Sequence, residues 1–157
     1  MKAIDLGRRF GYQALVAFAA AALFAACQSS PPQISINSAK AELSSGVVGE
    51  AMVTMSIKND GGPDMLTGVR TDIPGAKASF HVMEGERMAA VDTVKIPARS
   101  SLEFQMGGSH VMVEDMPRTM KAGSKINVTL VFQKSGEKQV PLTLQAMKMP
   151  MGHEHHM

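Results

Sequence analysis

Two short sequence patterns place metal-binding side chains at matched spacing. The order His-x-Met occurs at His81 and Met83, and again at His110 and Met112. In an extended strand, residues two positions apart point to the same face, so each pair presents an imidazole nitrogen beside a thioether sulfur. Each pair is therefore predicted to act as a bidentate soft donor for a metal ion.

The types of donor select the metal. Thioether and imidazole groups without a carboxylate cluster favour the soft monovalent ion Cu(I), whereas zinc sites use cysteine, further histidines or a carboxylate. Cys27 is the only cysteine, and it lies near the N-terminus. A blue-copper electron-transfer site, which needs a thiolate, is therefore not expected.

Met88 lies between the two pairs. Six residues separate it from His81, and 21 residues separate it from His110. Over residues 33–145 the chain resembles the periplasmic copper chaperone family called PCuAC, whose motif is a histidine, a spaced methionine, 21 residues and then His-x-Met. The first spacing is shorter here than in the family, which leaves open whether Met83 replaces or assists Met88.

The resemblance implies a cupredoxin-like fold that binds copper. It implies delivery of that copper toward the copper centres of a terminal cytochrome oxidase. The metal ligands expected on this basis are His81, Met83, Met88, His110 and Met112.

Most of the other methionines are predicted to fill space, because methionine is a common core residue. Met52 and Met55 lie in a run of apolar residues, 51–57, and both are assigned to the core. The same reasoning makes four more methionines loop-edge or core residues: Met65, Met106, Met116 and Met120.

The N-terminal residues have the form of an export signal. Basic residues precede an apolar run from Ala14 to Ala26, which is shorter than the roughly 20 residues of a membrane-spanning helix. Cys27 follows directly, as in a bacterial lipoprotein signal. We predict a signal peptide at 1–26, lipidation of Cys27, a tether at 27–32 and a periplasmic or cell-envelope location. The alternative is an ordinary cleavage site with an incidental thiol.

The composition argues against two other classes of function. Removal of the signal takes away three of the 16 basic residues and one of the 14 acidic residues, so the remaining charges balance. Without a basic surface or a supply of aromatic residues, nucleic acid is not an expected partner. No arrangement typical of catalytic residues is recognisable, so an enzyme is not expected.

The pattern of strands and turns predicts an all-β domain at residues 33–146. Some seven to nine short strands alternate with turn signals such as the run at 59–63, and no amphipathic helix is recognisable. With the family resemblance, the expected architecture is a cupredoxin-like antiparallel β-sandwich. The predicted strands lie near 34–36, 51–57, 66–71, 78–83, 88–96, 102–104, 110–112, 125–132 and 138–144.

The C-terminal segment, residues 147–157, differs from the rest of the chain. It has no apolar pattern and is predicted to be disordered without metal. Its methionines favour Cu(I) and its histidines favour Cu(II), so we expect an auxiliary copper site. The residues of this site are Met147, Met149, Met151, His153, His155 and His156.

The resulting hypothesis is an extracytoplasmic copper chaperone that is held at a membrane by its lipid anchor. Its expected partner is a copper-accepting protein such as cytochrome c oxidase or another copper chaperone. The alternatives are a lipoprotein that sequesters copper for resistance, and a structural or adhesion lipoprotein with an immunoglobulin-like sandwich and no metal.

Overall fold

The computed structural model describes residues 30–147, which form ten strands. These described residues contain no helix, and so none that is long and apolar enough to cross a membrane. The chain divides into two units, Met1–Ser30 and Pro31–Met157, and the second holds all ten strands. The predicted signal peptide, Cys27 and the tail beyond Met147 lie outside the described residues.

The all-β prediction is confirmed. The strands are β1 (Ile34–Leu43), β2 (Ala51–Asn59), β3 (Asp64–Thr71), β4 (Lys77–Glu84), β5 (Arg87–Val91), β6 (Val94–Ile96), β7 (Ser100–Phe104), β8 (His110–Glu114), β9 (Lys125–Phe132) and β10 (Gly136–Ala146).

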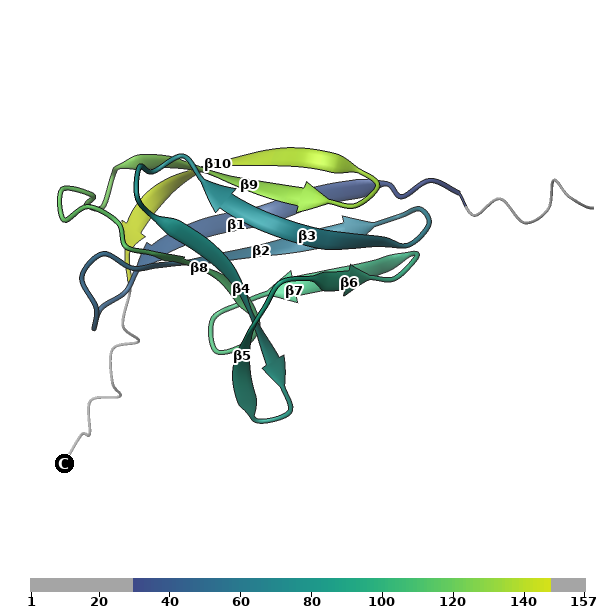
Figure 1. Cartoon of the computed structure of the whole chain (residues 1–157), viewed down its shortest axis with the longest axis horizontal. Helices are drawn as coiled ribbons and strands as arrows, with labels where there is room; N and C mark the ends of the chain where they lie inside the picture. Colours follow the sequence, from purple (N-terminus) through teal and green to yellow (C-terminus); the bar gives the residue numbers. More distant parts are fainter. Residues whose placement is uncertain (1–29, 148–157) are drawn as a thin grey trace, which may run out of the picture. The chain divides into compact units, whose positions relative to one another are not determined.

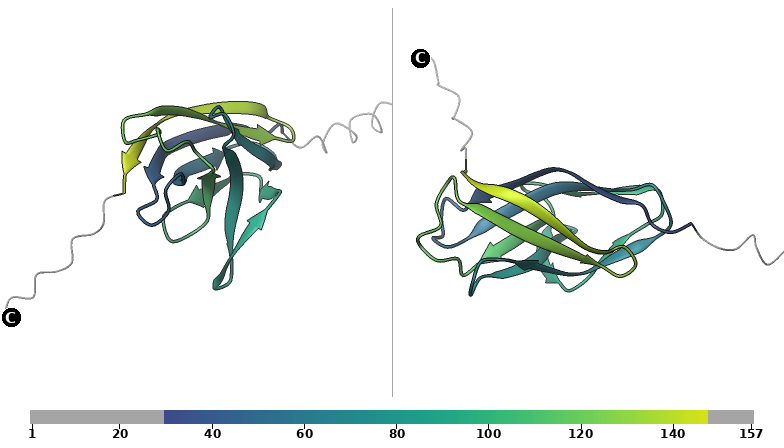
Figure 2. Two further views of the ribbon diagram at one scale, coloured as in Figure 1. Left: turned by 60° about the vertical axis from the view of Figure 1, so that its left-hand side comes forward. Right: turned by 90° about the horizontal axis from the view of Figure 1, so that it is seen from above.

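The strands form a single, strongly curved sheet that folds into two layers (Figures 1 and 2). Its order is β5-β4-β8-β2-β1-β10-β9-β3-β6, and β7 pairs with β2 beyond β8. Strand β10 belongs to both layers, because its first part pairs with β9 and its last residues pair with β1. The β1–β10 pair is parallel, from Ala41 opposite Leu144 to Leu43 opposite Ala146. All other pairs are antiparallel, as predicted.

The predicted strand at 88–96 is in fact two strands. Strand β5 pairs with β4 in one layer, whereas β6 pairs with β3 in the other layer. A bend at Asp92 separates them. The chain therefore crosses between the layers at this point, which leaves β5 as an edge strand in a hairpin that projects from the body of the domain (Figure 1).

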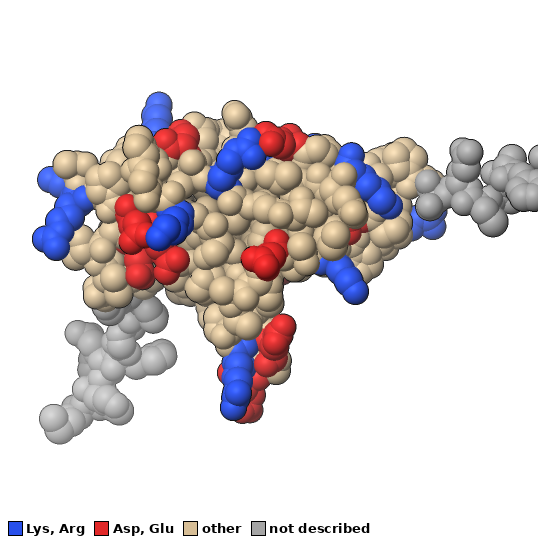
Figure 3. All heavy atoms as spheres, in the orientation of Figure 1, with Lys and Arg blue, Asp and Glu red and all other residues tan. Residues whose placement is uncertain are grey.

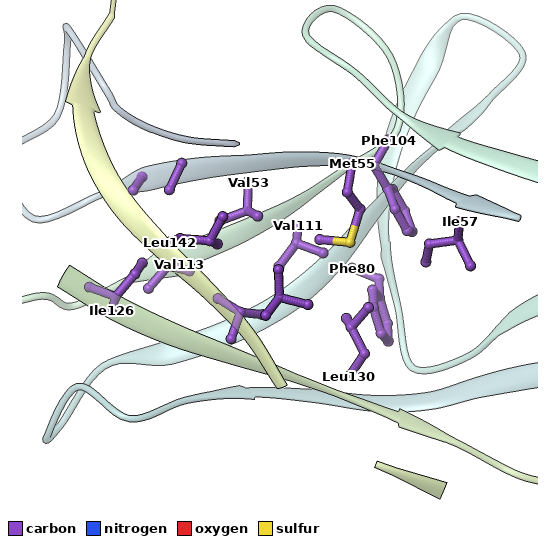
Figure 4. Close-up of a cluster of buried hydrophobic side chains, with 14 of the residues drawn as sticks. Val53, Met55, Ile57, Phe80, Phe104, Val111, Val113, Ile126, Leu130 and Leu142 are labelled. Carbon is purple, nitrogen blue, oxygen red and sulfur yellow. The ribbon is translucent and has the colours of Figure 1, made fainter. Parts of the chain in front are cut away.

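Buried and more exposed side chains alternate along the strands, so that one face of each strand contributes to the core. In β2, Ala51, Val53, Met55 and Ile57 are buried, and the residues between them are more exposed. Figure 4 shows such inward side chains from both layers in contact around Met55. Phe80 and Phe104 stack there with ring centroids 6.2 Å apart. Each large apolar side chain buried in this way contributes about 2 kcal/mol to stability.

Met52 is not a core residue, which corrects the sequence prediction. It alternates with the buried Ala51 and Val53 and is half-buried on the opposite, outer face of β2. Met55, three positions further on, lies on the inner face and is 2% exposed. Because successive residues of a strand point to opposite faces, two methionines three positions apart cannot both face the core.

Candidate metal site

The register between β4 and β8 places the two histidines directly opposite each other. His81 pairs with His110, and their ring centroids are 5.4 Å apart with an angle of 32° between the ring planes. Metal–imidazole bonds are about 2 Å long, so two imidazoles on one ion have centroids at most roughly 6 Å apart. The observed separation meets this limit.

His110 is nearly buried, with 6% of its surface exposed. Its Nδ1 lies 2.9 Å from the carbonyl oxygen of Gly108. A carbonyl oxygen only accepts hydrogen bonds, so Nδ1 carries the proton of the neutral ring and Nε2 has the free lone pair. Among the described residues, Nε2 of His110 has no hydrogen-bond partner although it is buried. This ring is oriented and protonated as a metal-bound imidazole would be.

A tight turn before β8 creates this arrangement. The backbone N–H of Gln105 donates to the carbonyl of Ser109 at 2.7 Å, and that of Gly108 donates back to Gln105 at 3.1 Å. Gly107 has a φ of 74°, a left-handed conformation that glycine adopts without strain. The bend at Gly107 and Gly108 therefore aims the carbonyl of Gly108 at His110.

His81 is held differently. It is half-buried, and its Nε2 lies 3.1 Å from Oγ of Ser79, which is two residues earlier on the same face. If this nitrogen binds a metal, the hydrogen bond must be released. Of the two histidines, His110 is the one with a buried nitrogen that the described residues leave without a partner.

Met83 and Met88 form the next pair on the same face. They are directly opposite each other in the β4–β5 hairpin, and 39% and 40% of their surfaces are exposed. The backbone N–H of Met83 donates to Oγ of Ser109 at 3.1 Å, which ties the hairpin to the start of β8. Figure 3 shows acidic and basic side chains together on this projecting hairpin.

Met112 lies on the other side of the histidine pair. It is half-buried and pairs with Ser79 on β4 and with Met52 on β2. Because directly opposite residues share a face, Met52 belongs to the same outer surface as the predicted donors. Met52 was not among the donors predicted from the sequence, although the alternation of β2 places it on the outer face.

The surroundings add few hard ligands. Within residues 30–147, no three His, Cys, Asp or Glu side chains are grouped so as to hold a metal. Beyond Met112, Lys77 forms an exposed ion pair with Asp115 at 2.9 Å. The pKa of Lys77 is raised, first by its hydrogen bond to Asp115 and then by the charges of Asp115 and Glu114. Of the predicted tail site, only Met147 is described.

These observations define a class: a β-sandwich domain whose outer face carries a histidine pair flanked by methionines. The chain belongs to the family described as "Putative lipoprotein LpqE-like", which matches residues 32–144. A comparison with curated protein sequences found no significant match.

Solved structures share the fold. The copper-bound PCuAC domain from PmoF2 is 26% identical with a TM-score of 0.60, and the match covers 76% of this chain and 100% of that domain. The solution structure of CuI-DR1885 from Deinococcus radiodurans is also 26% identical, with a TM-score of 0.56 and coverage of 80% and 85%. The apo PCuAC domain from PmoF1 has a TM-score of 0.64 at 23% identity, covering 74% and 97%. The resemblance to PCuAC domains expected from the motif is therefore confirmed.

Proposed function

We propose that this protein is an extracytoplasmic copper chaperone that binds Cu(I) between β4, β5 and β8. The observation that carries the proposal is the buried Nε2 of His110, which lacks a partner among the described residues and belongs to a ring whose centroid lies 5.4 Å from that of His81. Two solved structures of the same fold, the PCuAC domain from PmoF2 and CuI-DR1885, are copper-bound. The proposed ligands are His81, His110, Met112, Met88 and Met83. The two imidazoles hold the ion, and Met112 and the hairpin methionines approach it from opposite sides.

The donor chemistry supports Cu(I) as the cargo. Thioether sulfur and neutral imidazole are soft or intermediate ligands, and hard carboxylates do not gather around them in the described structure. Gly108 holds His110 through Nδ1, which leaves Nε2 for the metal. The His110 side of the site is therefore organised before the ion arrives, whereas His81 would exchange its contact with Ser79 for the metal.

Exposure of the hairpin methionines favours delivery over sequestration. Met83 and Met88 are each about two-fifths exposed at an edge strand, where an acceptor protein can approach the ion. A storage site is instead expected to bury the metal away from competing ligands. We propose that a copper-accepting protein takes the ion from this side, with a cytochrome c oxidase copper centre or another copper chaperone as the acceptor.

The proposal also includes a lipid anchor at Cys27 and a copper-binding role for the C-terminal segment. Lipidation at Cys27 would hold the domain at the outer side of a membrane, and the segment from Met147 to Met157 would collect copper for the folded site. Truncation after Ala146 is expected to lower the number of copper ions bound while leaving the tighter site intact. Equilibrium dialysis of both forms measures this number.

Competition against a chromophoric Cu(I) chelator tests the main proposal. The protein from Gln28 to Met157 is expected to bind Cu(I) at least 100-fold more tightly than its His110→Ala/Met112→Leu variant, as expected when two ligands are lost. Equal affinity would overturn the copper site. Transfer to an added copper-free acceptor separates delivery from sequestration, since a chaperone gives up copper faster than copper dissociates by itself.

A further inference from the structure

The outer face of the sheet carries a longer series of soft donors than the motif contains. Three successive pairs lie along β4: Met83 with Met88, then His81 with His110, then Ser79 with Met112. The last pair continues onto β2, where Met52 is directly opposite Met112. The series of soft donors ends there, because the residue opposite Met52 on β1 is Glu42.

Methionines lie on both sides of the histidine pair. Ser79 and Met83 are each two residues from His81, which is about 7 Å along a strand. The methionine pair of the hairpin therefore lies one step to one side of the histidines, and Met112 with Met52 lies one step to the other. A small ion held by both imidazoles cannot contact all four sulfurs at once.

The two methionine pairs also differ in exposure. Met83 and Met88 are on the projecting hairpin and are among the most exposed large apolar residues described. Met112 and Met52 are both half-buried on strands in the middle of the sheet. Directly opposite residues have Cβ atoms about 5 Å apart, and the flexible methionine side chain allows both sulfurs to reach one ion.

We propose that Met52 is a further copper ligand, and this inference rests on the proposed function. With Met112 it forms an inner thioether pair that holds Cu(I) against the histidines, while Met83 and Met88 form an outer pair. The ion exchanges between the two pairs without leaving the imidazoles. The inner pair retains copper, and the outer pair presents it to the acceptor.

Methyl NMR of the methionines tests the assignment directly. The protein from Gln28 to Met157, labelled at the methionine methyl carbons, is titrated with Cu(I) without oxygen. The signals of Met52 and Met112 are expected to shift together, whereas those of Met55 in the core and Met65 on the other layer stay in place. A shift of Met112 alone overturns the role of Met52 and leaves the proposed function standing. No shift at Met112 or Met88 overturns the proposed function itself.

Substitutions separate coordination from packing. Met52→Leu keeps the apolar volume, and it is expected to weaken Cu(I) binding roughly tenfold because a direct ligand is lost. The matched control is Met65→Leu, a half-buried methionine on β3 whose directly opposite residue is Lys95, and this change should leave affinity unchanged. Met52→His restores a donor and should restore affinity. If Met52→Leu binds copper like the original protein, the inference is wrong.

A double variant tests whether Met52 and Met112 act as one pair. Once Met112→Leu has removed the inner position, Met52→Leu is expected to add little further loss of affinity. Independent, additive losses from the two substitutions would show that Met52 does not share an ion with Met112, and would overturn the inner pair.

Discussion

Two sites in this domain contain buried polar side chains, and they differ in whether all of the polar atoms have hydrogen-bond partners. At the turn after β2, Asn59 and Asp64 engage every polar side-chain atom with a protein partner. On the face of β8, His110 has one nitrogen satisfied and the other without a partner among the described residues. Buried polar groups are normally hydrogen-bonded, so the exception at His110 supports its proposed role as a ligand.

The structural cluster connects the turn between β2 and β3 to three other segments: the start of β1, Pro97 after β6, and the β9–β10 turn. Oδ1 of Asn59 accepts from the backbone N–H groups of Gln33 and Gly61, and its Nδ2 donates to the carbonyls of Gly62 and Pro97. Asp64 accepts from the backbone of Met65, Lys134 and Ser135 and from the Ser135 hydroxyl. Its role is to fix the start of β1 and the β9–β10 turn to the turn between β2 and β3.

The largest effect is expected at Asn59. Substitution Asn59→Ala leaves several buried backbone groups without partners and should lower the free energy of unfolding by about 3–4 kcal/mol. Urea unfolding measures this value. Copper affinity of the folded variant should be unchanged, and a large loss of affinity there would show that the two clusters are coupled.

His110→Ala should reduce copper affinity strongly and the stability of the fold only slightly, which is the reverse of the effect of Asn59→Ala. Loss of a ligand is expected to reduce Cu(I) affinity at least 100-fold, which corresponds to about 2.7 kcal/mol. Without copper, the variant should lose only about 1 kcal/mol of stability, the value of one hydrogen bond. Thermal unfolding with and without Cu(I) checks both, because copper should raise the melting temperature of the original protein and not of the variant. A destabilisation as large as that of Asn59→Ala would remove the contrast between the clusters.

Asp64 gives the structural cluster a dependence on pH. Burial raises the pKa of Asp64, but the hydrogen bonds from Ser135, Met65 and Lys134 outweigh it, and the pKa falls below its ordinary value of 3.8. The resulting stabilisation is complete above 3.8 and is lost as the pH falls through the lowered pKa. Asp64→Asn should cost about 2 kcal/mol at neutral pH and flatten the fall of the stability curve as the pH drops below 3.8. An unchanged acid limb in urea unfolding at several pH values would contradict this role.

The smallest effects are expected at the hairpin methionines. Because Met83 and Met88 are directly opposite, either sulfur can take the place of the other. Each single change to leucine should weaken Cu(I) binding about threefold, and the double change should cost far more than the product. Chelator competition on the three variants measures this. A full loss with Met88→Leu alone would show that Met83 is not a ligand.

The local pattern of the sequence was enough to predict much of the fold. The alternation of apolar and polar residues predicted most of the strands, and the run of turn residues at 59–63 predicted the turn between β2 and β3. The two His-x-Met patterns indicated which side chains share a face within each strand. The role of these residues as metal ligands stays a prediction.

The remaining features depend on pairing between distant strands. Nothing local shows that Met52 lies opposite Met112, because that register is set by how the core faces of β2 and β8 pack. The same holds for the division of 87–96, where the chain changes layer at Asp92. The parallel pairing of β1 with β10 joins the two ends of the domain, which are more than a hundred residues apart in sequence.

This parallel pair gives the domain a mechanical property. Tension applied through the two ends of the chain pulls β1 and β10 in opposite directions along their length, so the bonds linking Ala41–Leu43 to Leu144–Ala146 are loaded in shear and resist together. Pulling across the β4–β5 hairpin opens its pairs one after another instead. In single-molecule stretching, where the unfolding rate governs rupture, the end-to-end direction should therefore need the greater force.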